Sequence, residues 1–459
     1  MTFQSLEYAV LLLAVFTGYW FVTRRFQNLL LLVASYLFYS FVDPKMALLL
    51  GGYTAVNYIA ARRIEADPNN SRKYLCIAIT ASLGALAFFK YAGFFVESIS
   101  DVLATIGIAN FQSTLKIILP VGISFYTFQS LGYVIDVYTK RTFARRSLID
   151  TALFISFFPQ LVAGPIERAS ALLPQFERRR SFDANRTARG ISLIVWGLFK
   201  KLVIADNVGM IVDSIFSTTQ PGAPMIWVGV LAFGVQILAD FSGYTDIARG
   251  SARLFGIELS LNFRHPWLAA SPADFWRRWH ITLSTWLRDY VYIPLGGNRN
   301  GRNRLVINLI VTFVLGGLWH GAAWNFVLWG LLNAALIIIW RAASHFKINV
   351  PTLPATLITF IVISASWLPF RESDLSYIGD NIADSTGDLK LALAFGITAL
   401  IYSLPIWIHA IVDRPRIADI WARNDVSRMV ALTALTLTSF IGILALRADT
   451  SAEFIYFRF

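Results

Sequence analysis

Two of the five histidines, His320 and His280, lie in sequence that suits acid–base chemistry. His320 belongs to the run G-G-L-W-H-G (316–321), inside a stretch, 306–340, of 35 residues without Asp, Glu, Lys or Arg. As one helix this stretch would be about 52 Å long, whereas a bilayer core is about 30 Å thick, so two crossings with a turn at the glycines are predicted. An ionisable side chain at such a turn is a functional candidate. A buried imidazole is neutral and suits a general base; a histidine hydrogen-bonded in the helical core is the structural alternative.

His280 lies in the densest polar sequence of the chain, residues 240–303. There S-P-A-D (271–274) predicts a helix start, with Ser271 as the N-cap and a proline at the first helical position. The residues that follow place aromatic side chains on one arc and arginines opposite, which predicts a continuous interfacial helix to about Tyr290. His280 falls at the border of the apolar arc, where an aromatic belt does not by itself explain it.

Several other chemistries are poorly supported. The chain has no Gly-Lys dipeptide and no G-x-S-x-G, so a P-loop and a nucleophile elbow of that type are excluded. Its histidines show no H-x-x-x-H or H-E-x-x-H spacing, and its one cysteine, Cys76, cannot form an intrachain disulfide, so no metal site is expected. His409 and Asp413, four residues apart, could pair on a helix, and we interpret such a pair as structural.

Composition places these residues in a membrane, because 56% of the 459 residues are apolar and 15% are charged, against about 25% in soluble proteins. No internal repeat or long polar linker divides the chain, so one transmembrane domain over residues 1–459 is expected, all-α and polytopic, with about twelve transmembrane helices. The first span has no basic n-region or cleavage site and is interpreted as retained. The predicted spans are 6–23, 27–43, 46–61, 74–96, 115–138, 188–217, 225–247, 305–319, 322–340, 354–370, 389–411 and 429–446.

The basic residues predict the orientation of these spans. With the N-terminus outside, 31 of the 40 Lys and Arg fall in inner loops, 7 lie outside or near outer ends, and Lys200 and Lys201 lie within a span. This distribution explains the net charge of +12 without nucleic acid, and the inner loops suit anionic membrane lipids. Both termini are then predicted to be periplasmic. The apolar run 148–166 has arginine-rich sequence on both sides, so a re-entrant or interfacial segment is predicted there.

Five segments of this sequence resemble the membrane-bound O-acyltransferase superfamily, in particular its bacterial alginate O-acetyltransferase branch. The match runs from about 120 to 340 through I-S-F-Y-T-F-Q-S-L-G-Y-V-I-D-V-Y (123–138), F-F-P-Q-L-V-A-G-P-I-E-R (157–168), D-F-S-G-Y-T-D-I-A (240–248), F-W-R-R-W-H-I-T-L-S-T-W-L-R-D-Y-V-Y-I-P-L-G-G-N-R (275–299) and G-L-W-H-G-A-A-W-N-F-V-L-W-G (317–330). The resemblance implies a helical bundle around a membrane-spanning tunnel. The essential histidine of the L-W-H-G motif corresponds to His320, and that of W-R-R-W-H corresponds to His280. Asp246 and Tyr244 are weaker candidates, since a polar helix end explains them equally well.

The resemblance also implies the reaction. An acetyl or other short acyl group would pass from a cytoplasmic thioester, with acetyl-CoA the first expectation, to a hydroxyl outside, with no bound cofactor. The acceptor would be an exopolysaccharide, reached through a periplasmic partner protein, at the inner membrane of a Gram-negative bacterium. His320 would be the base, and His280 would line the donor path, hold the thioester, orient other groups or be structural. Two alternatives stay open: D-alanyl or other acyl transfer from a carrier protein to a cell-envelope polymer, and a polysaccharide or lipid transporter, for which the chain lacks an ATP motif and has few acidic residues in its spans.

Overall fold

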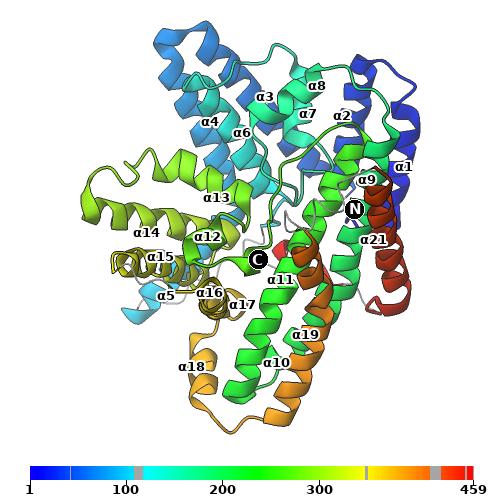
Figure 1. Cartoon of the computed structure of the whole chain (residues 1–459). Helices are drawn as coiled ribbons and strands as arrows, with labels where there is room; N and C mark the ends of the chain where they lie inside the picture. Colours follow the sequence, from blue (N-terminus) through cyan, green and yellow to red (C-terminus); the bar gives the residue numbers. More distant parts are fainter. Residues whose placement is uncertain (42, 108–116, 347–349, 414–424, 450–451, 458–459) are drawn as a thin grey trace. The chain divides into compact units, whose positions relative to one another are not determined.

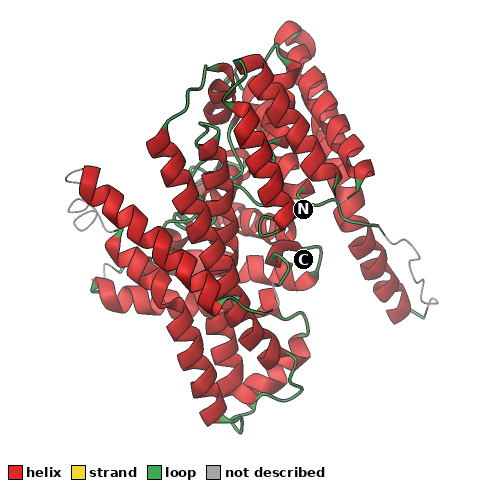
Figure 2. Cartoon of the chain, turned by 90° about the vertical axis from the view of Figure 1, so that its right-hand side faces the viewer, coloured by secondary structure: helices red, strands yellow, loops and turns green. Residues whose placement is uncertain are grey.

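The computed structural model describes the chain apart from residues 42, 108–116, 347–349, 414–424, 450–451 and 458–459. The described residues form helices joined by turns and loops, with no strand among them, so the all-α prediction is confirmed for this part of the chain (Figure 2). They divide into two compact units. Unit 1 holds residues 1–190 and 251–260, and unit 2 holds residues 191–250 and 261–459.

Unit 1 is built around α6, of which 14 of 16 residues are buried. Helices α3 and α4 pack against α6 and against each other, and α2 packs on α7 (Figure 1). The starts of these helices follow local rules: the Ser5 hydroxyl caps α1, and Asp43 caps α3 with Pro44 at its first position. The helices are α1 (Leu6–Tyr19), α2 (Arg24–Ser40), α3 (Pro44–Ala66), α4 (Ser71–Leu86), α5 (Ala92–Thr105), α6 (Ile123–Tyr138), α7 (Leu148–Ser156) and α8 (Ala169–Glu177), with short helical turns η1 (Pro68–Asn70) and η2 (Ala87–Tyr91).

Unit 2 contains both candidate histidines. Its longest helix is α11, beside which α10 and α19 run (Figure 1). Helix α9 begins in unit 1 and α11 ends there. The helices are α9 (Ala184–Phe199), α10 (Asp206–Phe216), α11 (Gly222–Leu254), α12 (Pro272–Trp276), α13 (Ile281–Leu287), α14 (Gly301–His320), α15 (Trp324–Ser344), α16 (Thr352–Ser366), α17 (Leu368–Arg371), α18 (Leu375–Ala383), α19 (Leu389–Val412) and α21 (Asp425–Leu446), with η3 (Lys200–Ala205), η4 (Pro266–Leu268), η5 (Arg288–Tyr292) and η6 (Ile455–Phe457).

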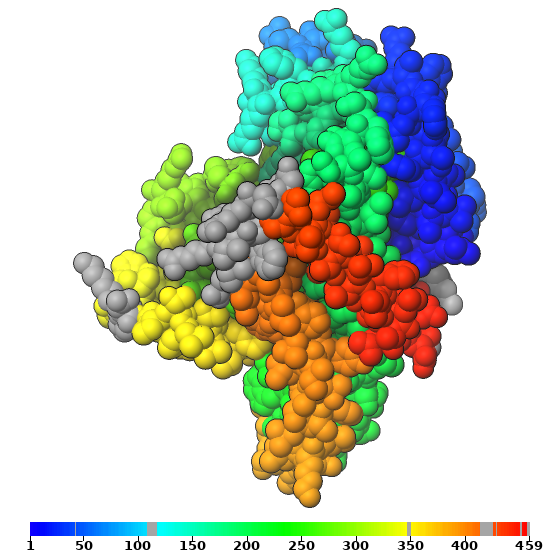
Figure 3. All heavy atoms as spheres, turned by 45° about the vertical axis from the view of Figure 1, so that its right-hand side comes forward, coloured from blue at the N-terminus to red at the C-terminus, as the bar shows by residue number. Residues whose placement is uncertain are grey.

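Seven helical segments among the described residues are long and apolar enough to cross a membrane. The prediction of a multi-pass membrane protein is therefore supported, while the count of about twelve spans stays a prediction. Helices α19 and α21 lie on one face of unit 2, where many of their apolar side chains are exposed and suit contact with lipid (Figure 3). The seven segments are Pro68–Thr105, Gly222–Leu254, Gly301–His320, Trp324–Ser344, Thr352–Arg371, Leu389–Val412 and Met429–Leu446.

Two predictions about the path of the chain can be compared with the helices. The charge-free stretch 306–340 is divided between α14 and α15, as predicted, and the break at residues 321–323 begins at the last glycine of the run. In the run 148–166 the helix α7 has only nine residues, about 14 Å, which is too short to cross a bilayer. That this run is re-entrant or interfacial stays a prediction.

Candidate active site

His320 is the last residue of α14 and is only 3% exposed. Four aromatic rings surround its imidazole, and one of them belongs to the preceding residue. The distances between ring centroids are 5.0 Å to Trp319, 5.1 Å to Trp329, 5.2 Å to Phe370 and 5.3 Å to Tyr456. The imidazole thus lies in an enclosed, largely apolar environment.

The glycines before His320 let α14 and α15 approach closely. A Cβ at Gly317 would lie 2.1 Å from the carbonyl oxygen of Phe326, and one at Gly330 would lie 2.5 Å from that of Phe313. Neither neighbouring atom belongs to a side chain that could turn away. The two glycines therefore permit a helix contact that places His320 where the hairpin turns.

His280 contacts the same group of rings from another segment. Its ring centroid lies 6.5 Å from that of His320 and 5.5 Å from that of Trp319, and the residue is 1% exposed. Burial lowers the pKa of His280 to about 3, so its imidazole is neutral near pH 7. The structure therefore brings together the two histidines that the sequence pattern singled out.

The predicted continuous helix from Ser271 to about Tyr290 is wrong. Its start is confirmed, because the Ser271 hydroxyl accepts a hydrogen bond from the Asp274 N–H, but α12 has only five residues. His280 has a left-handed backbone with φ of 38°, and a new helix, α13, starts after it. The break turns the histidine into the interior, whereas a wheel through an unbroken helix leaves it at the border of the apolar arc.

Asn262, which sequence reasoning did not select, holds the His280 ring. Its Oδ1 accepts hydrogen bonds from the Thr282 backbone N–H at 3.2 Å and from the Thr282 hydroxyl at 2.9 Å, and it lies 3.2 Å from His280 Nδ1. A backbone N–H can only donate, so the Asn262 atom is the carbonyl oxygen and His280 Nδ1 must carry the proton. Nε2 of the neutral ring is then a hydrogen-bond acceptor.

Tyr456 is a second residue that sequence reasoning missed. Its ring centroid lies 4.4 Å from that of Phe241 and 6.1 Å from that of Trp319, in addition to the contact with His320, and its hydroxyl oxygen is buried. The only local signal was the aromatic run F-I-Y-F (454–457), which nothing in its own neighbourhood connects with the histidine motifs.

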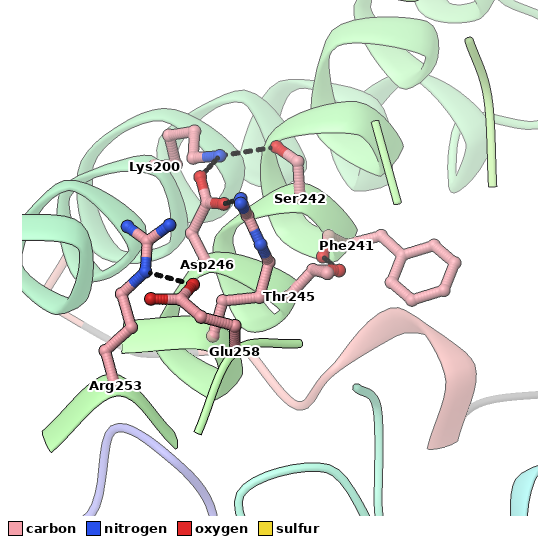
Figure 4. Close-up of polar contacts among 8 residues, drawn as sticks. Lys200, Phe241, Ser242, Thr245, Asp246, Arg253 and Glu258 are labelled. Atoms are coloured by element: carbon pink, nitrogen blue, oxygen red, sulfur yellow. Dashed lines mark hydrogen bonds and ion pairs between the residues drawn. The ribbon is translucent and has the colours of Figure 1, made fainter. Parts of the chain in front are cut away.

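The weaker candidates lie outside this cluster or at its edge. Asp246 accepts from Lys200 Nζ at 2.6 Å, and Lys200 also contacts Ser242 (Figure 4). Arg249 makes a further ion pair with Asp246, at 3.2 Å. Tyr244 stacks on Phe454, with ring centroids 4.1 Å apart. Asp246 is therefore explained by its ion pairs, while Tyr244 supports the segment that carries Tyr456.

The suggested pair of His409 and Asp413 does not form as predicted. Asp413 Oδ2 lies 2.7 Å from His265 Nε2, and this hydrogen bond holds the pKa of Asp413 below its ordinary value. The His409 ring instead stacks on Trp196, with ring centroids 5.0 Å apart. In the described part of the chain no three His, Cys, Asp or Glu side chains converge as metal ligands would.

Both histidines lie within a part of the chain that matches a known protein family. Residues 140–361 match the membrane-bound O-acyltransferase (MBOAT) family. The chain belongs to this family, and it is an O-acyltransferase.

The names of similar proteins indicate the polymers on which these relatives act. The chain is 40% identical to the probable alginate O-acetylase AlgI of Pseudomonas aeruginosa, over 82% of this chain and 73% of that protein. It is 35% identical to the protein of the same name from Pseudomonas putida over the whole of both chains. It is 38% identical to the peptidoglycan O-acetyltransferase of Helicobacter pylori, over 76% of this chain and 72% of that protein.

Proposed function

We propose that this enzyme moves an acetyl or other short acyl group from a cytoplasmic thioester to a hydroxyl on an exported polysaccharide or on a periplasmic partner protein. The observation that carries the proposal is the burial of His320 among aromatic rings, beside His280, at the turn of the α14–α15 hairpin. The O-acetyl transfer named for the relatives supports acetyl as the acyl group. The proposal includes an inner-membrane location with both termini periplasmic and acetyl-CoA as the first donor to test.

The proposed chemistry needs one base. Neutral His320 takes the proton of the acceptor hydroxyl while the hydroxyl oxygen forms a bond to the thioester carbonyl carbon. The carbon–sulfur bond then breaks, and the leaving thiolate takes the proton back from the imidazolium. A hydroxyl is too weak an acid to be ionised near pH 7, and general-base catalysis of this kind is typically worth about 10²–10⁴ in rate.

The sequence left several roles open for His280, and the hydrogen bond of its ring reduces their number. Because its Nδ1–H is directed at Asn262, Nε2 has no proton to donate to a thioester carbonyl. It suits accepting a hydrogen bond from an N–H or O–H group of a substrate. We therefore propose that His280 orients a bound substrate and does not polarise the carbonyl.

Radiolabelled acetyl-CoA supplied to purified membranes should transfer its label to a protein or polysaccharide. The label is expected only where this chain is expressed, because the acyl group must cross from the thioester to an acceptor. Membranes with the empty vector are the control. If acetyl-CoA leaves no label but an acyl group loaded on a carrier protein does, the donor part of the proposal is wrong and the carrier-dependent alternative is supported.

Asn262→Asp should change how transfer depends on pH. A carboxylate facing the Nδ1–H stabilises the imidazolium and raises the pKa of His280 from about 3. As the pH is lowered, this variant should therefore lose transfer at a higher pH than the wild type does. The reason is that a protonated His280 ring can no longer accept a hydrogen bond at Nε2. The measurement is the rate of transfer between pH 4.5 and 8.

The matched control for this variant is Asn308→Asp, because Asn308 is equally buried but bonds the carbonyl of Gly297. A pH profile of Asn262→Asp that coincides with the wild-type profile would contradict the role given to His280.

A further inference from the structure

A group of three buried charges in unit 2 is not used by the proposed chemistry. Lys201 Nζ lies 2.9 Å from Asp206 Oδ1 and 2.9 Å from Asp240 Oδ1. The three residues are 1%, 3% and 3% exposed, respectively. Buried ion pairs are costly to desolvate, and apolar residues of similar volume are often at least as stabilising. General stability is therefore a weak explanation for keeping three charges here.

The second oxygen of Asp240 has a specific partner. Asp240 Oδ2 accepts a hydrogen bond of 2.7 Å from the backbone N–H of Ile455, 215 positions along the chain. The contact with Lys201 Nζ at Oδ1 orients this carboxyl group, so that Oδ2 faces the Ile455 N–H. A hydrogen bond that involves a charged group is stronger than one between neutral groups.

The aromatic residues on both sides of Ile455 also contact α11. Phe454 is fully buried and stacks on Tyr244, and Phe241 contacts both Phe454 and Tyr456. On α11, Tyr244 lies four residues after Asp240 and three after Phe241, so its side chain neighbours both of theirs, and we call these three residues the docking face. The backbone hydrogen bond fixes the register of residues 454–456 on this face, and that register places Tyr456 against His320.

We propose that Asp240, held by Lys201 and Asp206, is a positioning residue that anchors residues 454–456 on α11 and so completes the wall around His320. Its importance for transfer rests on the proposed function, whereas the anchoring does not. The Lys200–Asp246 pair lies on the same two elements, η3 and α11, where Lys200 also bonds Ser242 and Asp246 also pairs with Arg249 (Figure 4). It is therefore a matched control for loss of a buried charge.

The anchoring is tested by access to a cysteine at position 455. In the full chain with Cys76→Ser, the variant Ile455→Cys carries one thiol on the anchored segment, and its rate of reaction with a small maleimide is measured in detergent. Adding Asp240→Ala should raise this rate at least about tenfold, since a hydrogen bond to a charged group is lost. Asp240→Asn, which keeps an oxygen for the Ile455 N–H, should label more slowly than Asp240→Ala, and Asp246→Asn should label like the parent.

Three results would overturn the proposal. The first is an unchanged labelling rate in Asp240→Ala, and the second is an equal increase in Asp246→Asn, which would indicate general loosening. The third is faster labelling of Asp240→Ala with full acyl transfer, which would remove the positioning role. Thermal unfolding of each variant in detergent checks that the chain is folded. Failure of the proposed function is recognised separately, because it is measured with Asp240 intact and only His320 changed.

Discussion

His320→Ala is expected to lose acyl transfer by about 10²–10⁴-fold, the usual contribution of a general base, while its abundance in the membrane stays that of the wild type. The imidazole is the group within the aromatic cluster that we assign to remove the proton from the acceptor hydroxyl. Alanine leaves the surrounding rings in place but removes the proton acceptor. The measurement is label transferred from radiolabelled acetyl-CoA, or from the donor found to work, per amount of enzyme in purified membranes.

His345→Ala is the control for this substitution. His345 is exposed at the end of α15, where its Nδ1 contacts the Arg341 carbonyl, and its loss should leave transfer unchanged. His320→Gln, which keeps most of the side-chain volume, should be as inactive as His320→Ala. Equal transfer by His320→Ala and wild type would show that the histidine is structural and that the mechanism is wrong.

Gly317→Ala is expected to lower the free energy of unfolding by at least about 2 kcal/mol and to reduce transfer as His320 is displaced. The added methyl group would lie 2.1 Å from the Phe326 carbonyl oxygen, so relief requires α14 and α15 to move apart. His320 lies three residues further along α14, and such a movement shifts its ring. The measurement is the midpoint of thermal unfolding in detergent, together with transfer at low temperature.

Gly316→Ala provides a neighbouring comparison. A Cβ there would lie 3.2 Å from Leu287 Cδ1, the end of a flexible side chain, so this variant should unfold close to the wild-type temperature. If both variants unfold at the same temperature, the close backbone contact at Gly317 is not what positions the hairpin.

Features that depend on neighbouring residues were predicted well. The charge-free stretch required two helices because of its length, and the glycine run located the break beside His320. The cap at Ser271 was predicted for the same reason, since its donor lies three residues away. Hydropathy identified a membrane protein, although it did not establish how many helices cross.

Features that depend on distant partners were missed or assigned wrongly. The helix expected through His280 is broken, because Asn262, 18 residues earlier, binds the ring and the Thr282 N–H. Asp413 has two possible histidine partners, and it bonds His265, 148 positions away, in preference to its helical neighbour.

The residues of this chain therefore specify, through hydropathy, glycine placement and local capping, that it is a helical membrane protein with His320 at the turn between two helices. Burial and hydrogen bonding along a helix depend on spacings of a few residues, and these spacings are visible in the sequence. What surrounds His320 depends on three-dimensional packing instead. Tyr456 contacts it from a segment whose Ile455 N–H bonds Asp240, a contact between positions 215 apart that no local pattern contains.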